Sequence, residues 1–188
     1  MSVRTVFSDD EKLFYITYTC YEWLPLIELT DGYDIIYGWF DYIKRKHNVQ
    51  VSSYVIMPNH LHCILSFPDK NVSLNQVMRE GKIYLARKLL NRLKERGQAE
   101  VLEQLKMGVT ASRLAKGQEH VVFQRGFEAK AIVTKHFLEQ KMRYIHLNPI
   151  RGNYNLVENW RDYAHSSASY YEYGMPGYYM PVHYDELG

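Results

Sequence analysis

The sequence predicts an α+β fold in which an antiparallel four-stranded sheet carries helices packed on one of its faces. Three observations lead to this class. Short runs rich in β-branched and aromatic residues alternate with longer stretches of helical periodicity. A Pro-Asn turn joins two of the strand-like runs as a hairpin. The resulting order of strand, helix, strand, strand, helix, strand and helix is typical of a split βαβ arrangement.

The strands are expected where Tyr, Val, Ile and Thr are concentrated, because these residues favour a pleated, half-buried surface. The second and third strands flank Pro58-Asn59, and the fourth is irregular because it bends at Gly126. The predicted strands are 12–20, 49–57, 60–67 and a fourth made of 121–123 and 127–133.

Helical periodicity marks three longer segments, each with a recognisable end. The first begins near Gly32, Ser73 is the expected N-cap of the second, and Thr134 is that of the third. Pro149 stops the third helix, because the residue before a proline is pushed out of the helical region. The predicted helices are 32–46, 73–96 and 134–148, and residues 97–120 form a polar, partly helical connection.

The length and composition indicate one globular domain. The chain has 188 residues, of which 46% are hydrophobic and 23% charged, so it can bury a substantial core. We expect a single domain over residues 1–188, with the α+β core at about 12–150. Residues 151–188, rich in Tyr, Gly and Pro, are expected to form an ordered tail that wraps around this core.

Charge, cysteine content and hydropathy indicate how the protein could bind nucleic acid and where in the cell it is expected. The net charge is only +2, so affinity for nucleic acid would have to come from local clusters of Lys and Arg. Cys20 and Cys63 lie in apolar runs and imply no disulfide framework. Residues 1–11 lack the basic start and apolar stretch of a signal peptide, and no run is long enough to span a membrane. We therefore expect a cytoplasmic protein without membrane association.

The strongest local signal is the pair His60 and His62 at the start of the third strand. Alternate residues of a strand point to one face, so these two side chains lie roughly 7 Å apart on the same side. Such a pair can hold a metal ion, although an isolated His-x-His is as often structural. Cys63 points to the opposite face and does not complete a zinc site.

The last helix offers further polar groups to the same region. Tyr144 and Asn148 are four residues apart and share one helix face, and Gln140 lies four residues before Tyr144. A tyrosine and an amide from this helix could therefore reach a phosphate bound at the histidines.

Three motifs occur in this order along the chain: YVIMPNHLH at 54–62, YIHLNP at 144–149 and DYAHSSA at 162–168. Together they strongly resemble the HUH single-tyrosine transposases, specifically the REP-associated tyrosine transposase branch. The resemblance extends from the first strand to about Tyr171.

The resemblance implies a ferredoxin-like (RRM-like) catalytic domain that acts on single-stranded DNA, often beside a hairpin. By motif position, His60 and His62 would be metal ligands, Tyr144 the nucleophile and Asn148 the third ligand. Many single-tyrosine relatives have glutamine four residues after the tyrosine, where this chain has Asn148. Gln140 or a water is therefore an alternative third ligand. The enzyme would cleave and rejoin DNA through a 5′-phosphotyrosine.

The implied reaction needs a cation and a route for a proton. A tyrosine with its ordinary pKa of about 10 is mostly protonated at neutral pH. Mg²⁺ or Mn²⁺ suits phosphoryl chemistry and an amide ligand, whereas imidazoles alone favour transition metals such as Zn²⁺. His146 is a possible base, but it lies on another helix face from Tyr144, and a packing or hydrogen-bonding role in the core is the alternative.

DNA contacts are expected from basic side chains of the second predicted helix and the fourth strand, with an affinity that falls as salt rises. A solvated helix face is the simpler alternative for the helical ones. Several tyrosines could stack on bases, although core packing is at least as common a role. The basic candidates are Arg79, Lys82, Arg87, Lys88, Arg125 and Lys130, and the aromatic candidates are Tyr15, Tyr18, Tyr21 and Tyr54.

Other functions remain open at this point. A non-catalytic RRM-like module would bind single-stranded nucleic acid by aromatic stacking, but it has no use for the paired histidines. HUH initiators and relaxases usually carry their histidine and tyrosine motifs in a different order. A homodimer is possible, in which an exchanged last helix would bring Tyr144 to a partner's histidines. Ser166 and Ser167, which lack a Gly-rich elbow, are expected to cap or turn the chain.

Overall fold

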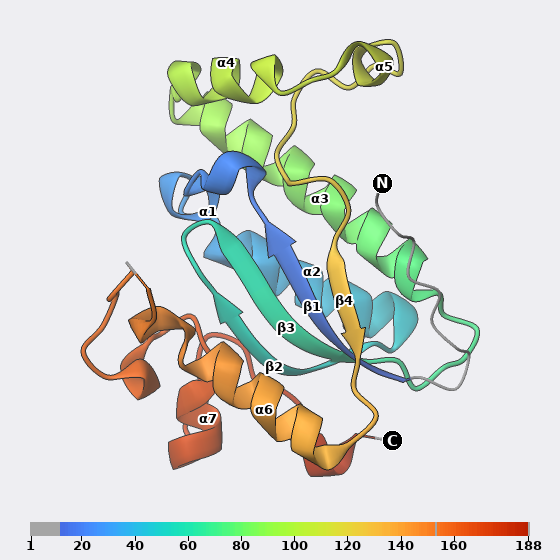
Figure 1. Cartoon of the computed structure of the whole chain (residues 1–188), viewed down its shortest axis with the longest axis vertical. Helices are drawn as coiled ribbons and strands as arrows, with labels where there is room; N and C mark the ends of the chain where they lie inside the picture. Colours follow the sequence, from blue (N-terminus) through green and yellow to red (C-terminus); the bar gives the residue numbers. More distant parts are fainter. Residues whose placement is uncertain (1–11, 153, 188) are drawn as a thin grey trace.

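The computed structural model describes residues 12–152 and 154–187, and its centre is a four-stranded antiparallel sheet (Figure 1). The strand order is β2-β3-β1-β4, with β1 and β3 in the middle. The predicted fold class is confirmed. The expectation about a signal peptide falls on residues 1–11 and lies outside the described residues. The strands are β1 (Leu13–Thr19), β2 (Gln50–Ile56), β3 (His60–Ser66) and β4 (Glu128–Ala131).

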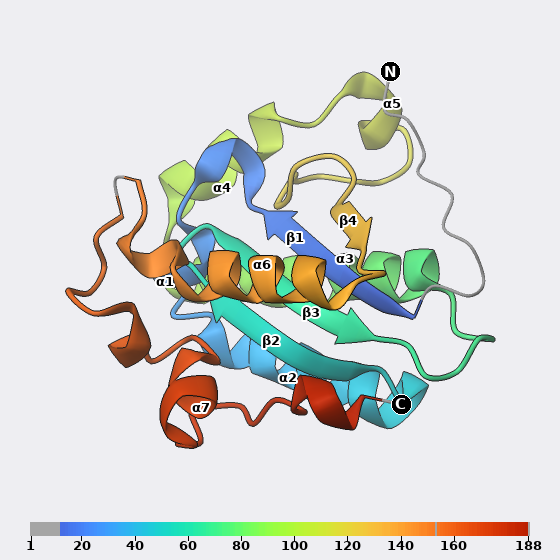
Figure 2. The ribbon, with the colours of Figure 1, turned by 60° about the horizontal axis from the view of Figure 1, so that its bottom comes forward.

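The long helices cover both faces of the sheet. Helices α2 (Tyr33–His47) and α3 (Leu74–Glu95) pack on one face, whereas α6 (Lys135–His146) crosses the other (Figure 2). The expectation that all helices pack on one face was therefore wrong for α6. The reason lies in the strands: in β2 and β3 nearly every residue is buried, so both faces need a cover.

Helix boundaries follow local capping. The Ser73 hydroxyl accepts a hydrogen bond from the backbone of Gln76, and the Thr134 hydroxyl does the same for Phe137. Helix α6 ends at His146, two residues earlier than predicted. Asn148–Ile150 then forms a separate 3₁₀ turn, η2, that contains Pro149.

The segment before β4 is partly helical, as expected. It contains α4 (Ala99–Met107) and α5 (Ala111–Leu114). Phe123 makes a single bridge to Cys20, and the chain then bends at Gly126, whose φ is 77°, before β4 begins. The remaining short helical segments are η1 (Tyr21–Trp23), α1 (Leu26–Leu29), η3 (Trp160–Asp162), α7 (Ala168–Tyr173) and η4 (Tyr184–Glu186).

The tail runs along the outer edge of β2. The backbone N–H of Ile56 donates to His165, that of Ser167 donates to Tyr54, and that of Val182 donates to Val51. These bonds satisfy an edge strand that would otherwise be open to pairing with other chains. No helix of the described residues is long and apolar enough to cross a membrane.

Candidate active site

The register of β3 places His60 and His62 on the face covered by α6. Their ring centroids are 4.7 Å apart, whereas Leu61 and Cys63 point into the opposite core with α2 and α3. The alternation predicted from the sequence is therefore present, and Cys63 is remote from the pair.

Asn59 sets the orientation of the His60 ring. Its amide nitrogen donates to the carbonyl of Trp23 (2.9 Å) and to the hydroxyl of Tyr154 (2.5 Å), so its oxygen must face His60. This oxygen lies 2.7 Å from His60 Nδ1 and accepts its proton. Burial lowers the pKa of His60 to about 4, so at neutral pH the ring is uncharged and Nε2 carries a lone pair.

Asn148 Oδ1 lies 3.1 Å from this Nε2 atom of His60. Two lone-pair donors at such a distance suit a shared cation, since neighbouring ligands at right angles about an ion with bonds of about 2.1 Å are about 3 Å apart. Asn148 is buried, and η2 holds it in place. The residues present therefore fit a divalent metal ion.

His62 is held in the same manner as His60, through Nδ1. This atom lies 2.8 Å from the hydroxyl of Tyr15 and 2.9 Å from that of Thr17, and the Tyr15 ring stacks on the imidazole. Burial, together with repulsion from the Lys141 ammonium and from His60 when that ring is protonated, keeps the pKa of His62 well below its usual range. In both histidines Nδ1 is thus engaged by a neighbouring side chain, and Nε2 is the atom left to bind a metal ion.

Tyr144 projects from the end of α6 toward the histidines of its own chain. Its ring centroid is 5.3 Å from that of His62 and 6.2 Å from that of Tyr15, and the side chain is 38% exposed. Two cations flank the ring: Lys141 Nζ lies 5.7 Å from its centroid and the Arg151 guanidinium 5.3 Å. A phenol that is accessible, near the imidazoles and beside positive charge is well placed to attack a phosphate.

An open cavity of about 520 Å³ adjoins Tyr144 on the outer side of α6. Gln140 lines this cavity as an exposed side chain, and no hydrogen bond joins it to either histidine among the described residues. Of the two amides considered from the sequence, Asn148 is the one beside His60. The other lining residues are His136, Glu139, Arg143 and Arg151.

His146 belongs to the core. Its Nε2 atom lies 2.9 Å from the Ser167 hydroxyl and 3.1 Å from that of Ser53, and its ring stacks against Trp160. Burial lowers its pKa to about 4. Ser166 and Ser167 also serve the fold, because their hydroxyls bond to the backbone of Tyr54 in β2.

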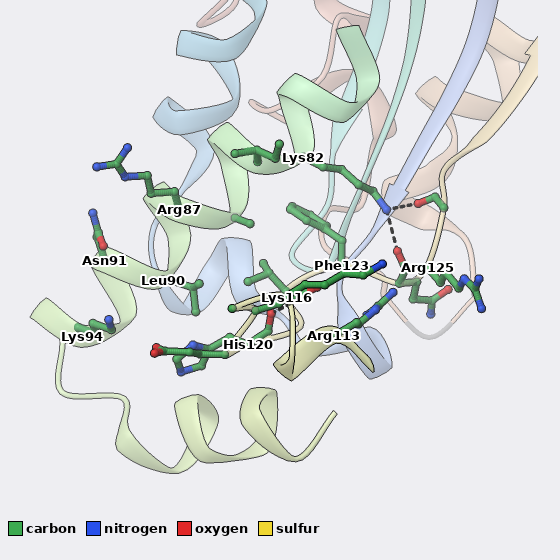
Figure 3. Close-up of a pocket in the computed structure, with 18 residues that line it drawn as sticks. Lys82, Arg87, Leu90, Asn91, Lys94, Arg113, Lys116, His120, Phe123 and Arg125 are labelled. Atoms are coloured by element: carbon green, nitrogen blue, oxygen red, sulfur yellow. Dashed lines mark hydrogen bonds between the residues drawn. The ribbon is translucent and has the colours of Figure 1, made fainter. Parts of the chain in front are cut away.

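Three of the basic residues predicted to contact DNA meet in a groove of about 790 Å³ between α3 and residues 113–126 (Figure 3). They are Lys82, Arg87 and Arg125. Lys82 donates to the carbonyls of Gln124 and Gly126. Its burial lowers its pKa to about 8. We refer to this site as the basic groove, and it lies on the α3 side of the sheet, away from the histidines.

The other predicted DNA contacts are elsewhere. Arg79 is exposed on α3 outside the groove, and Lys88 lines a neighbouring cavity of about 580 Å³ together with Arg87. Lys130 is paired with Glu128 at 3.0 Å on β4. Of the proposed stacking tyrosines, Tyr15, Tyr18 and Tyr54 are buried and Tyr21 is half-buried, so they are packing residues.

Sequence reasoning missed several residues that the fold brings to these sites. The sequence predicts Asn59 only as part of a turn, and it predicts no role for Thr17. The basic groove also contains positive charge from Lys94, Arg113 and Lys116. The last two belong to the connection at residues 97–120, whose structure the sequence predicts least clearly. A signal existed for Asn59, since a polar residue directly beside a candidate metal ligand can hydrogen-bond to that ligand and orient it.

Among the described residues, no three or more His, Cys, Asp and Glu side chains cluster so as to hold a metal ion. The donor atoms present at the candidate site are two imidazole nitrogens and an amide oxygen, a set that would leave coordination positions of an ion open.

Comparison with known families places this chain. Residues 31–148 match the family model described as "Transposase IS200 like", which is more than half of the chain. The protein is a transposase, a class of enzyme that cleaves and transfers DNA. It belongs to the IS200-like transposase family. No curated protein matches the sequence.

A solved structure shares the fold of this chain. A REP-associated tyrosine transposase bound to a REP hairpin is 18% identical, with a TM-score of 0.66. That match covers 100% of this chain and 97% of the other. A candidate transposase from Deinococcus radiodurans is 12% identical with a TM-score of 0.43, covering 77% of this chain and 95% of that one.

Proposed function

We propose that this protein cleaves and rejoins single-stranded DNA through a 5′-phosphotyrosine on Tyr144. The observation that carries the proposal is that β3 meets the segment formed by α6 and η2, which lies far from it in the sequence. The phenol ring of Tyr144 lies 5.3 Å from the His62 ring, and Asn148 Oδ1 lies 3.1 Å from His60 Nε2, all within one chain.

In the proposed reaction the Tyr144 oxygen forms a bond to the scissile phosphorus. The bond from phosphorus to the 3′-oxygen breaks, the electron pair leaves with that oxygen, and the oxygen takes up a proton to become a free 3′-hydroxyl. The phenol proton passes to solvent, since the side chain is exposed and no described residue is hydrogen-bonded to its hydroxyl. The phosphodiester energy is kept in the tyrosine ester, so a later 3′-hydroxyl can reverse the step without ATP.

His60, His62 and Asn148 are the residues we propose to hold Mg²⁺ or Mn²⁺. Such an ion, when bound, would polarise the phosphate and stabilise the charge that builds up during the reaction. The protein itself fixes the orientation of the two imidazole rings. Asn59 holds His60, and Tyr15 and Thr17 hold His62. Lys141 and Arg151, which flank the Tyr144 ring, would attract the phosphate and stabilise the negative charge that builds up on it.

The proposed partner is single-stranded DNA next to a hairpin, by analogy with the neighbour that was solved with a REP hairpin. We propose that phosphates of this DNA bind in the basic groove through Lys82, Arg87 and Arg125, with weaker contributions from Arg79, Lys88 and Lys130. Since Tyr144 reaches the histidines of its own chain, a homodimer would not be needed to complete the site.

The test is covalent capture. Labelled single strands that carry a hairpin and flanking sequence are incubated with the protein and Mg²⁺ or Mn²⁺, and the products are separated under denaturing conditions. We expect a protein–DNA adduct that Tyr144→Phe abolishes while DNA binding persists. Tyr173→Phe, which changes an exposed tyrosine of the tail, is the matched control and should still form the adduct. An adduct that survives Tyr144→Phe would contradict the proposal.

A further inference from the structure

Trp23 lies beside His60, at the other end of the imidazole pair from Tyr144. Its indole is in edge contact with the His60 ring, with centroids 5.6 Å apart, and 55% of the side chain is exposed. Trp39, by contrast, is fully buried in the core. An exposed indole beside candidate metal ligands presents a free aromatic surface next to the place where DNA would react.

The backbone holds Trp23 in a strained conformation. Glu22 and Trp23 have φ angles of 49° and 59°, in the left-handed region that residues other than glycine rarely adopt. The Trp23 carbonyl is fixed by the amide of Asn59, the residue that also orients His60. Such strain persists only where the surroundings impose it, and it is concentrated at functional sites.

The order of the rings defines two sides of the site. Trp23 contacts His60, His60 contacts His62, and His62 contacts Tyr144. Among the described residues, Trp23 has no ring contact with His62 and Tyr144 has none with His60. The indole and the phenol thus lie at opposite ends of the imidazole pair.

This inference rests on the proposed function and adds the geometry of in-line displacement. The leaving oxygen departs on the side of phosphorus opposite the attacking oxygen. Tyr144 attacks from the His62 side, so the nucleotide that keeps its 3′-oxygen must lie toward His60 and Trp23. We infer that Trp23 stacks on the unpaired base immediately 5′ of the scissile phosphate and holds that nucleotide in place for cleavage.

Binding is measured first, with Tyr144→Phe protein so that no cleavage occurs. Single-stranded DNA should quench tryptophan fluorescence, and Trp23→Leu should lose most of this quenching and bind about 10-fold or more weakly. Trp23→Phe, which retains an aromatic face, should restore much of the affinity. Tyr173→Leu, which removes an exposed aromatic side chain of the tail, is the control and should bind normally. Equal binding and quenching by Trp23→Leu would overturn the inference.

Cleavage assays with abasic substrates then show which base stacks on Trp23. An abasic site 5′ of the cleaved bond should slow adduct formation by protein with Trp23 but have little further effect on Trp23→Leu, whereas an abasic site on the 3′ side should affect both proteins equally. The reverse pattern would overturn the 5′ assignment. If no substrate yields an adduct, the proposed function and this assignment both fail, while the binding data still decide whether Trp23 stacks on bases.

Discussion

The titration of His146 gives a quantitative prediction, because it distinguishes a catalytic base from a neutral histidine buried in the core. The imidazole is buried and bonded to Ser53 and Ser167, and its pKa falls from 6.5 to about 4. A group that stays neutral when folded but takes up a proton when unfolded makes stability depend on pH.

The sign and size of the change in the free energy of unfolding with pH follow from the pKa values of His146 in the unfolded and folded chains. Between pH 6.5 and about 4 the unfolded chain binds one more proton at His146 than the folded chain, so the free energy of unfolding falls as pH falls. This contribution is fully present above pH 6.5. Integrating the linkage relation from pH 8 to pH 5 gives a loss of about 2 kcal/mol from this residue.

The assay is urea denaturation of wild-type protein and of His146→Gln, at both pH values and without metal. His60 and His62 also lose stability at low pH, but they are present in both proteins, so their contribution cancels in the comparison. The variant should be less stable at pH 8, and its stability should decline by about 2 kcal/mol less on acidification. Equal declines in the two proteins would show that His146 titrates normally and is not the neutral core residue described here.

Three further changes test the site and the groove. His60→Ala should lower metal-dependent cleavage by about 100-fold or more with little change in the thermal unfolding midpoint, and collapse of the fold would instead indicate a structural histidine. Lys141→Met should slow adduct formation by about 10-fold and Lys141→Arg should restore it, because the charge beside Tyr144 is what matters; equal rates for both variants would contradict this. Arg87→Ala and Arg125→Ala should weaken binding to all DNA sequences alike and reduce the salt slope by about 0.7 to 0.9 per lost phosphate contact, as measured by titration at several salt concentrations. An unchanged slope would place the DNA outside the basic groove.

Local patterns were sufficient to predict much of the site. Strand alternation put His60 and His62 on one face, because this periodicity is a property of the backbone. The prediction that Tyr144 and Asn148 share one helix face was wrong, since α6 ends at His146 and Asn148 lies in η2. The same patterns could not say which face of the sheet the last helix would cover. That choice depends on which apolar strand residues remain uncovered, and β2 and β3 are buried on both sides.

Contacts between distant segments were beyond sequence reasoning. The orientation of Asn59 depends on Trp23, 36 residues before it, and on Tyr154, 95 residues after it. The basic groove likewise forms only when residues 113–126 fold back against α3, which gathers Arg113 and Lys116 beside Lys82. No local periodicity predicts such contacts, because they depend on how the loops pack against the sheet in the folded protein.

The choice of amide ligand is the sharpest remaining test of the site. Asn148 lies in η2, two residues beyond the end of α6, and this turn brings its short side chain to 3.1 Å from His60 Nε2. A longer amide at this buried position would crowd its neighbours. Asn148→Gln should therefore raise the metal concentration needed for half-maximal cleavage.

Asn148→Asp should lower that concentration, since a carboxylate of equal length favours hard divalent cations. Gln140→Ala is the matched control, because Gln140 is exposed and forms no hydrogen bond to His60 among the described residues. Its metal requirement should equal that of the wild type. If Gln140→Ala raises the requirement and Asn148→Ala does not, the third ligand comes from the helix face and not from the turn, and the Asn148 assignment is wrong.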